Sequence, residues 1–289
     1  MALLLLGAIF LFFLVAIFSI STFMGGSSPL ATGEKVGVIE VSGVITSSKS
    51  TIAHLLRFRK SDSIKAIVLR IDSPGGGVGP SQEICEEVQK TVKVKPVVVS
   101  MGSVAASGGY YIASPANRIF ANPGTITGSI GVILEFTNFQ ELLQKIGLKS
   151  QVVKSGEHKD IGSPVRPMTE GDRKILQALI DDVHQQFIAA VAKGRKLDIE
   201  KVRGLADGRI FSGRQAVTVG LVDQLGDFQD AVKAAAGLAG IHGEPRLVYP
   251  PREKPGILQY LVEDSLSRFR KGLQEKTTAG LDFLWSGVN

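Results

Sequence analysis

The feature that most constrains the fold is an alternation of short apolar strands with amphipathic helices. Strand patterns rich in branched aliphatic residues occupy residues 35–41 (KVGVIEV), 64–71 (IKAIVLRI) and 95–101 (KPVVVSM). Helical patterns follow the first strand at residues 51–60 and the second at about 81–91. Strands that are apolar almost throughout belong to a sheet covered on both faces, and their alternation with helices indicates βαβ units. The sequence therefore predicts an α/β core.

The same alternation continues to about residue 238. Thr169 followed by Asp172 forms a capping-box pattern, which predicts the start of a long helix. Apolar residues then repeat along one face of that helix: Ile175, Leu179, Val183, Phe187 and Val191. The other expected helices lie at about 105–113, 138–146, 199–205, 213–219 and 228–238. The expected extended segments lie at 117–122, 125–133 and 148–156. We expect an irregular segment at 158–167.

The N-terminal residues carry a separate signal. Ala2–Met24 has no charged residue, and about 20 such residues are enough for a helix to cross a bilayer. A cleaved signal peptide is the alternative, but its apolar region is usually only about 7–15 residues long. We expect a transmembrane anchor at 1–24, a tether at 25–34, the α/β domain at 35–243 and a C-terminal tail, helical in part, at 244–289. No Lys or Arg precedes the anchor, so loop charge does not decide its orientation.

Charge and cysteine content exclude some classes of function. The formal net charge of +6 comes from 33 basic and 27 acidic residues that are spread through the chain without long runs. This balance suits a protein beside an anionic membrane surface and gives no argument for a nucleic-acid partner. Cys85 is the only cysteine, so the chain forms no internal disulfide, and its apolar surroundings predict a small core residue.

The run of small residues from Val99 to Pro115, VSMGSVAASGGYYIASP, contains the first candidate catalytic residue. Ser107 follows a strand and opens a helix, and its neighbours are too small to block an approaching carbonyl group. A helix N-terminus directs N–H groups at a developing oxyanion, which needs two donors at about 3 Å. Gly108 and Gly76, the latter in the loop IDSPGGG, are the candidate donors. The loop IDSPGGG lacks the sequence pattern of a phosphate-binding loop. For the small residues between Val99 and Pro115, the alternative explanation is close packing of a helix on the sheet.

A serine nucleophile needs a base, and the sequence offers two kinds. The histidines are His54, His158, His184 and His242. His158 and Lys159 are adjacent in the irregular segment, and in an extended chain only one of two neighbours faces Ser107. Lysine acts as a base near neutral pH only if its pKa falls by roughly three units, which burial achieves when no carboxylate is close. Asp160 opposes that change if it lies on the same side as Lys159.

Five motifs in a fixed order resemble those of one known family. They are IDSPGGG, MGSVAASGGYYIA, TGSIGVI, SGEHKDIGSP and DGRIFSGRQAVTVGLVDQLG, and they follow the apolar N-terminus. In this order they closely resemble the short, single-repeat form of the bacterial signal peptide peptidase A family. The resemblance covers about residues 35–238, and the segment after about residue 243 lies outside it.

The resemblance implies a serine–lysine endopeptidase on a Clp-protease/crotonase-like fold of repeated β-β-α units. Ser107 matches the family's nucleophile and Lys159 its general base, which leaves His158 without a catalytic role. Ser129 matches a serine that orients the lysine ammonium group, and Gly76 and Gly108 match oxyanion positions. No metal and no cofactor is implied.

The resemblance also implies a setting for the reaction. Family members of this form assemble into membrane-tethered homo-oligomeric rings in which the serine of one subunit meets the lysine of the next. Their catalytic domain lies on the extracytoplasmic side of the bacterial cytoplasmic membrane, where remnant signal peptides in the lipid bilayer are the substrates. An apolar peptide binds well in extended form by adding a strand to a sheet edge. The chain departs from the family pattern in having no basic residue before the apolar segment.

Three other functions are compatible with parts of the sequence. A membrane serine protease of the stomatin-partner type shares the Ser–Lys chemistry but prefers another peptide. A crotonase-like acyl-CoA enzyme shares the fold, although thioester chemistry has no need of a Ser/Lys pair or an anchor. A non-catalytic ring scaffold requires only that the small residues serve packing.

Overall fold

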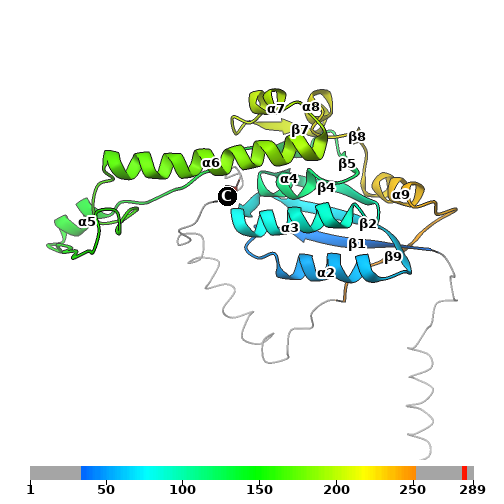
Figure 1. Ribbon diagram of the computed structural model, residues 1–289, viewed down its shortest axis with the longest axis horizontal. Helices are drawn as coiled ribbons and strands as arrows, with labels where there is room; N and C mark the ends of the chain where they lie inside the picture. The colour runs from blue at the N-terminus through cyan, green and yellow to red at the C-terminus, as the bar shows by residue number, and fades with distance from the viewer. Residues whose placement is uncertain (1–33, 252–281, 285–289) are drawn as a thin grey trace, which may run out of the picture. The chain divides into compact units, whose positions relative to one another are not determined.

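Parallel strands of branched aliphatic residues form the centre of the domain. The computed structural model describes residues 34–251 and 282–284. In it β1 (Lys35–Ser42), β2 (Ile64–Ser73) and β4 (Val97–Ala106) lie side by side in the order β4-β2-β1 and pair in parallel (Figure 1). The predicted α/β core is therefore confirmed.

Shorter strands extend the sheet on both sides. The first half of β4 pairs in parallel with β5 (Arg118–Ala121), and the second half pairs with β6 (Ile126–Gly128). The remaining strands of this sheet are β7 (Ile210–Ser212), antiparallel to β6, β8 (Gln224–Leu225), parallel to β5, and β9 (Arg246–Val248), parallel to β1. Because β9 lies beyond residue 243, the sheet extends past the boundary that the sequence predicted for the domain.

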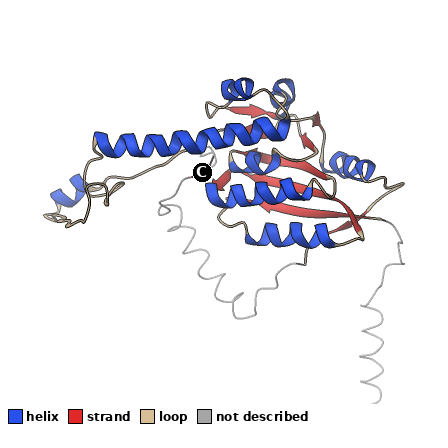
Figure 2. Ribbon diagram, viewed as in Figure 1, coloured by secondary structure: helices blue, strands red, loops and turns tan. Residues whose placement is uncertain are grey.

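Helices cover both faces of the sheet, as the apolar strands require (Figure 2). On one face lie α2 (Lys49–Lys60), α3 (Val78–Thr91) and α4 (Gly108–Ala113); on the other lies α9 (Phe228–Leu238). Alternate residues of β2 supply the two cores: Ile67 and Leu69 face the first layer, whereas Val68 packs with α9. Cys85 is buried in the first layer, as predicted.

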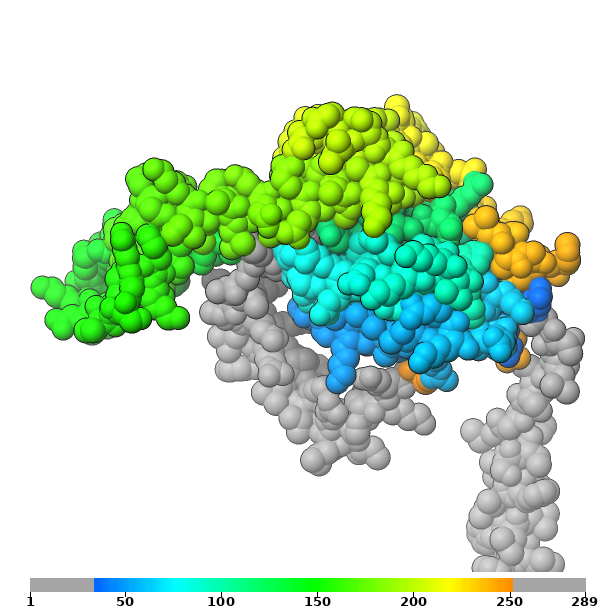
Figure 3. All heavy atoms as spheres, viewed as in Figure 1, coloured from blue at the N-terminus to red at the C-terminus, as the bar shows by residue number. Residues whose placement is uncertain are grey.

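A long helix leaves the body of the domain and carries an arm. The helix α6 (Glu170–Arg195) starts with the predicted capping box, in which Thr169 and Asp172 bond reciprocally. Its second half is buried through Val183, Phe187 and Val191, whereas Ile175 and Leu179 in its first half are exposed. That first half, the irregular segment before it and α5 (Gln140–Lys145) project away from α3 and α4 (Figures 1 and 3). We call residues 137–180 the arm.

Two sequence-based expectations about secondary structure are wrong. The helix predicted at 105–113 begins only at Gly108, because Ala105 and Ala106 pair with β6 and belong to β4. The strand predicted at 148–156 does not form. Its residues are exposed and lie in the arm, where no described strand offers them an edge. The expected helices at 199–205 and 213–219 are confirmed as α7 (Ile199–Leu205) and α8 (Gly213–Val219).

The small residues around α4 serve close packing. A Cβ atom on Gly109 would lie 2.9 Å from the carbonyl oxygen of Ser73, and one on Gly102 would lie 2.7 Å from Cγ of Asp72. Both glycines therefore let α4 and the end of β4 approach β2 closely. The packing explanation of the VSMGSVAASGGYYIASP run is correct for these two positions.

The predicted anchor, and the predicted tether apart from Glu34, lie outside the described residues. The chain divides into two units, Met1–Gly33 and Glu34–Asn289, and the features above belong to the second. Among the described residues, no helix has the length and apolar character needed to cross a bilayer.

We expect Gly109→Ala to destabilise the domain, because α4 must then move away from the Ser73 carbonyl. The usual cost of such overpacking is about 1–3 kcal/mol in the free energy of unfolding. Urea unfolding of the detergent-solubilised protein measures it. The matched control is Gly79→Ala in α3, where an added Cβ meets nothing within 4 Å. Equal stability of the two variants would contradict the packing role of Gly109.

Candidate active site

Ser107 occupies a strained turn between β4 and α4. Its backbone angles are φ 53° and ψ −119°, a region that residues with a side chain rarely adopt, and it is only 1% exposed. Two hydrogen bonds of 2.8 Å hold the turn: the Ser107 N–H donates to the Gly128 carbonyl, and the Ser107 carbonyl accepts from the Tyr111 N–H. A serine on a strained strand-to-helix turn is typical of a nucleophile that must project from the end of a sheet.

The N-terminus of α4 supplies one set of N–H groups beside Ser107. Gly108 is the first residue of this helix, and the first N–H groups of a helix have no partner within it. The Ser107 hydroxyl makes no hydrogen bond to another described residue. The predicted nucleophile and the first predicted oxyanion donor are therefore adjacent.

The glycine loop after β2 lies next to this turn. Its residues form the short strand β3 (Gly75–Gly77), which contacts α4. The Ile45 N–H donates to the Gly75 carbonyl at 2.8 Å, and the Gly77 N–H donates to the Ile45 carbonyl at 2.9 Å. Gly76 has φ 155°, and a Cβ there would lie 2.4 Å from the Ile45 oxygen. Only glycine fits this position. Its close approach to Ile45 fixes the loop, and a backbone N–H that serves as an oxyanion donor needs such a fixed place.

Ser129 lies beside Ser107. The β4–β6 register pairs Ala106 with Gly128, so Ser129 immediately follows the carbonyl that holds the Ser107 turn. Ser129 is 8% exposed, and its N–H donates to the Arg209 carbonyl at 2.9 Å. The structure thus places Ser107, Gly108, Ser129 and the glycine loop at one end of the sheet.

Lys159 is not brought to Ser107 within one chain. It lies in the arm, where its side chain is exposed and its ammonium group bonds to no described residue. Its neighbour His158 places Nδ1 3.3 Å from Oδ1 of Asp172, so the imidazole has a partner within the arm. The carboxylate of Asp160 is held by Arg166 and Lys154 and makes no ion pair with Lys159. The sequence pattern did not reveal this role of Arg166.

A second segment that the sequence did not connect with the site is the C-terminal strand. Residues Asp282–Leu284, β10, pair antiparallel with β3, and Phe283 stands opposite Gly76. The edge of the glycine loop therefore accepts an extended backbone. The run LDFLW at 281–285 was the available signal, because aromatic and branched residues favour strands.

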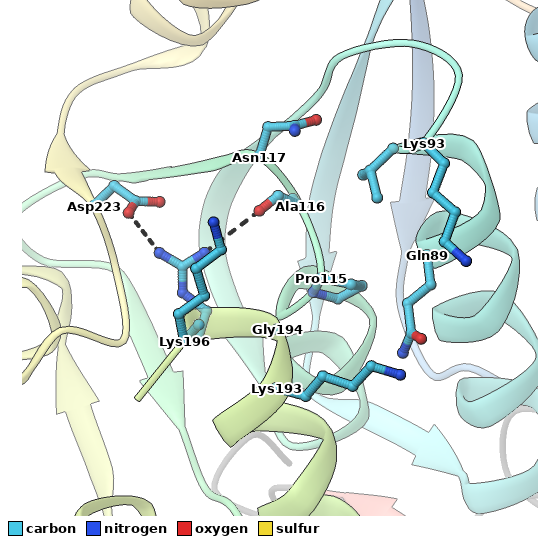
Figure 4. A pocket seen from close by; sticks show the side chains of 11 residues that line it. Gln89, Lys93, Pro115, Ala116, Asn117, Lys193, Gly194, Lys196 and Asp223 are labelled. Atoms are coloured by element: carbon cyan, nitrogen blue, oxygen red, sulfur yellow. Dashed lines mark hydrogen bonds and ion pairs between the residues drawn. The ribbon is translucent and has the colours of Figure 1, made fainter. Parts of the chain in front are cut away.

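A cavity of about 480 Å³ lies at the opposite end of α4 from Ser107 (Figure 4). Its charged lining consists of Lys93, Lys193, Arg195, Lys196 and Asp223, and Arg195 is paired with Asp223. The lysines stand at or just beyond the C-terminal ends of α3 and α6, where cations offset the partial negative charge of a helix end. None of the candidate catalytic residues lines it. Among the described residues, no group of His, Cys, Asp or Glu side chains has the arrangement of a metal site.

Two protein-family models match the chain. Residues 89–242 match peptidase family S49, and residues 35–125 match Clp protease. The two matches together cover β1 through α9, including the Ser107 turn, the glycine loop and the arm. The fold is therefore that of the Clp-protease type, as the motifs implied.

Named relatives agree with these matches. A protein named as a protease in Synechocystis sp. is 48% identical over 73% of this chain and 76% of its own length. A protein of Enterococcus faecium named as a signal peptide peptidase, SppA, is 38% identical over 70% of this chain and 63% of its own length. Protease 4 of Salmonella typhi is 36% identical over 88% of this chain, which corresponds to 42% of Protease 4.

We expect Gly76→Ala to reduce peptide hydrolysis sharply, because the new Cβ overlaps the Ile45 backbone and displaces the loop. Loss of one oxyanion donor typically lowers kcat by about 10²–10³-fold. The measurement is kcat on a fluorogenic apolar peptide. Gly124→Ala is the control, since an added Cβ there meets nothing within 4 Å. If both variants keep full kcat, Gly76 is not a donor.

Proposed function

We propose that this chain, which belongs to peptidase family S49 and is a serine protease, hydrolyses peptide bonds with Ser107 as nucleophile and Lys159 as general base. The observation that carries the first assignment is the strained, buried turn that places Ser107 at the N-terminus of α4. Family membership favours proteolysis over the acyl-CoA alternative on the same fold.

The reaction follows from the positions of these groups. The Ser107 Oγ attacks the scissile carbonyl carbon as its proton passes to the Lys159 Nζ, and the N–H groups of Gly76 and Gly108 receive the oxyanion. The leaving amine takes the proton from Lys159, which leaves an acyl group on Ser107. A water molecule, deprotonated by Lys159, attacks the acyl carbonyl carbon, the bond to Ser107 Oγ breaks, and Lys159 returns the proton to Oγ as the acid product leaves. The Ser129 hydroxyl orients the lysine between these steps.

We place the lysine of each site on a neighbouring subunit. Within one chain Lys159 is exposed and lies in the arm, whereas a lysine base must lose most of its hydration to deprotonate near pH 7. The arm also exposes large apolar side chains, which need a partner: Phe139, Leu142, Ile146, Leu148, Val152, Val153, Met168, Ile175 and Leu179. A head-to-tail ring of identical chains satisfies both requirements, because each arm reaches the next subunit's Ser107.

The proposed substrates are extended apolar peptides, with remnant signal peptides as the natural class. The pairing of β10 with β3 supports this binding mode, because it places an antiparallel backbone beside Gly76. The apolar segment at Ala2–Met24 would hold the domain at the bacterial cytoplasmic membrane, on the extracytoplasmic side. Comparison of signal peptides with stomatin-like sequences as substrates separates this proposal from the stomatin-partner alternative.

Mixed assemblies test the shared site. Ser107→Ala and Lys159→Ala are each expected to abolish hydrolysis while leaving assembly intact. If the subunits of the two variants are dissociated and reassembled together, a lysine from one can meet a serine from the other. Random mixing in a head-to-tail ring restores about a quarter of the sites. The measurement is peptide hydrolysis by the co-assembled protein.

The control is the same mixture without dissociation, which should stay inactive. Failure of the co-assembled variants to regain any hydrolysis, with rings confirmed by light scattering, would show that the dyad does not form between subunits. Full activity of either single variant would instead exclude the Ser107–Lys159 pair.

Removal of residues 282–289 tests the substrate edge. This deletion removes β10, so the β3 edge becomes free, and we expect KM for an apolar peptide to fall severalfold with kcat unchanged. Removal of residues 285–289 alone keeps the paired strand and should leave KM as it is. Identical KM values for both truncations would contradict strand addition at β3.

A further inference from the structure

Arg166 is the most fully bonded side chain of the arm. Its Nε donates to Oδ2 of Asp160 at 2.8 Å, and one terminal nitrogen donates to Oδ1 and to the carbonyl of the same residue at 2.8 and 3.2 Å. The other terminal nitrogen donates to Oδ2 of Asp172 at 2.5 Å and to the Pro167 carbonyl at 2.9 Å. These five acceptors match the five N–H donors of a guanidinium group. The segment around Arg166 forms no helix or strand, so these side-chain hydrogen bonds hold it in place.

The two carboxylates of the cluster are committed to Arg166. Asp160 is 14% exposed at its side chain and also accepts from the Lys154 ammonium group at 2.8 Å. Asp172, at 2% exposure, also accepts from the Thr169 N–H at 3.1 Å and faces His158. The Arg166 guanidinium holds the pKa of both carboxyls well below the usual range. Both side chains therefore stay ionised and fixed.

The cluster adjoins Lys159. Asp160 is the next residue, and its backbone carbonyl is one of the five acceptors, so Arg166 fixes the chain directly after the lysine. A free carboxylate within about 4–6 Å of a lysine favours the charged ammonium form, which cannot accept a proton. Arg166 removes that carboxylate from reach.

We propose that Arg166 is a positioning residue for the catalytic base: it binds Asp160 and Asp172 so that neither carboxylate pairs with Lys159. This inference rests on the proposed function, in which Lys159 is the base. Arg166 acts through Lys159 and contacts no substrate. A lysine in place of Arg166 would not do the same, because an ammonium group lacks the planar fork that binds Asp160 through two nitrogens.

Of the two carboxylates that Arg166 binds, Asp160 is the one that loss of Arg166 would release to pair with Lys159. The charged and titratable groups on the surrounding segments are Lys149, Lys154, Glu157, His158, Asp160 and Arg166 of its own segment, Glu170, Asp172, Arg173 and Lys174 at the start of α6, and Glu141 and Lys145 of α5. Without Arg166, Asp172 keeps its bond from Thr169, whereas Asp160 keeps only the contact from Lys154 to Oδ1. Oδ2 of Asp160 is then free to turn to Lys159.

The test is the pH profile of kcat/KM for an apolar fluorogenic peptide, measured on the full-length assembled protein. The acid limb of this profile reports deprotonation of the base. In Arg166→Gln we expect the limb to move about one pH unit or more toward alkaline pH, so that kcat/KM at pH 7 falls about tenfold and recovers near pH 9. Arg203→Gln is the matched control, since Arg203 pairs with Glu200 on α7, and should leave the limb unchanged.

Two further variants separate positioning from a purely structural role. Asp160→Asn added to Arg166→Gln removes the competing carboxylate and should return the limb toward its original pH. Loss of arm structure would not be repaired in this way. If Arg166→Gln does not fold, Arg166→Lys replaces it. This variant can hold only one of the two carboxylates, and we expect a smaller shift in the same direction.

An acid limb that stays in place in folded Arg166→Gln, or in folded Arg166→Lys where the first does not fold, overturns the inference. So does a shifted limb that Asp160→Asn fails to restore. Failure of the proposed function looks different: Lys159→Ala would then retain hydrolysis. If Lys159→Ala is inactive but the Arg166 variants are unshifted, the base assignment stands and only the role of Arg166 is wrong.

Discussion

The hydrogen bond from the Ser107 N–H to the Gly128 carbonyl is the interaction on which the site depends. It closes a turn with φ 53°, a conformation that a serine holds only when its surroundings impose it. The second half of β4 must therefore pair with β6, and α4 must start at once after the turn. Gly109 lets α4 lie close against the end of β2. The same close approach brings the glycine loop beside the serine.

The body of the domain holds only part of the proposed catalytic machinery. It supplies Ser107, Ser129 and the glycine N–H groups, whereas Lys159 is exposed in the arm and its ammonium group bonds to no described residue. In the proposed assembly, the neighbouring subunit covers Lys159, and Arg166 keeps nearby carboxylates away from it. Activity would then depend on ring formation, because an isolated chain leaves its lysine hydrated. Such an arrangement confines hydrolysis to the assembled form.

The sequence predicted those features that local patterns determine. The apolar strands, the capping box of Thr169 and Asp172 and the glycine loop all follow from residue type and short spacing. The strand expected at 148–156 failed because strand formation needs a neighbouring edge, which a sequence pattern does not supply. The Arg166 cluster and the pairing of β10 with β3 depend on tertiary contacts, which the spacing of residues in the sequence does not predict. The role of Lys159 came only from the family resemblance.

The most direct test of the central claim is covalent labelling with a serine-directed fluorophosphonate, followed by peptide mapping. Only an activated serine reacts at an appreciable rate, because the unperturbed hydroxyl is a weak nucleophile. We predict a single label on Ser107 in the native chain and loss of that label in Lys159→Ala. A label on another serine, or equal labelling of Ser107 in both proteins, would contradict it.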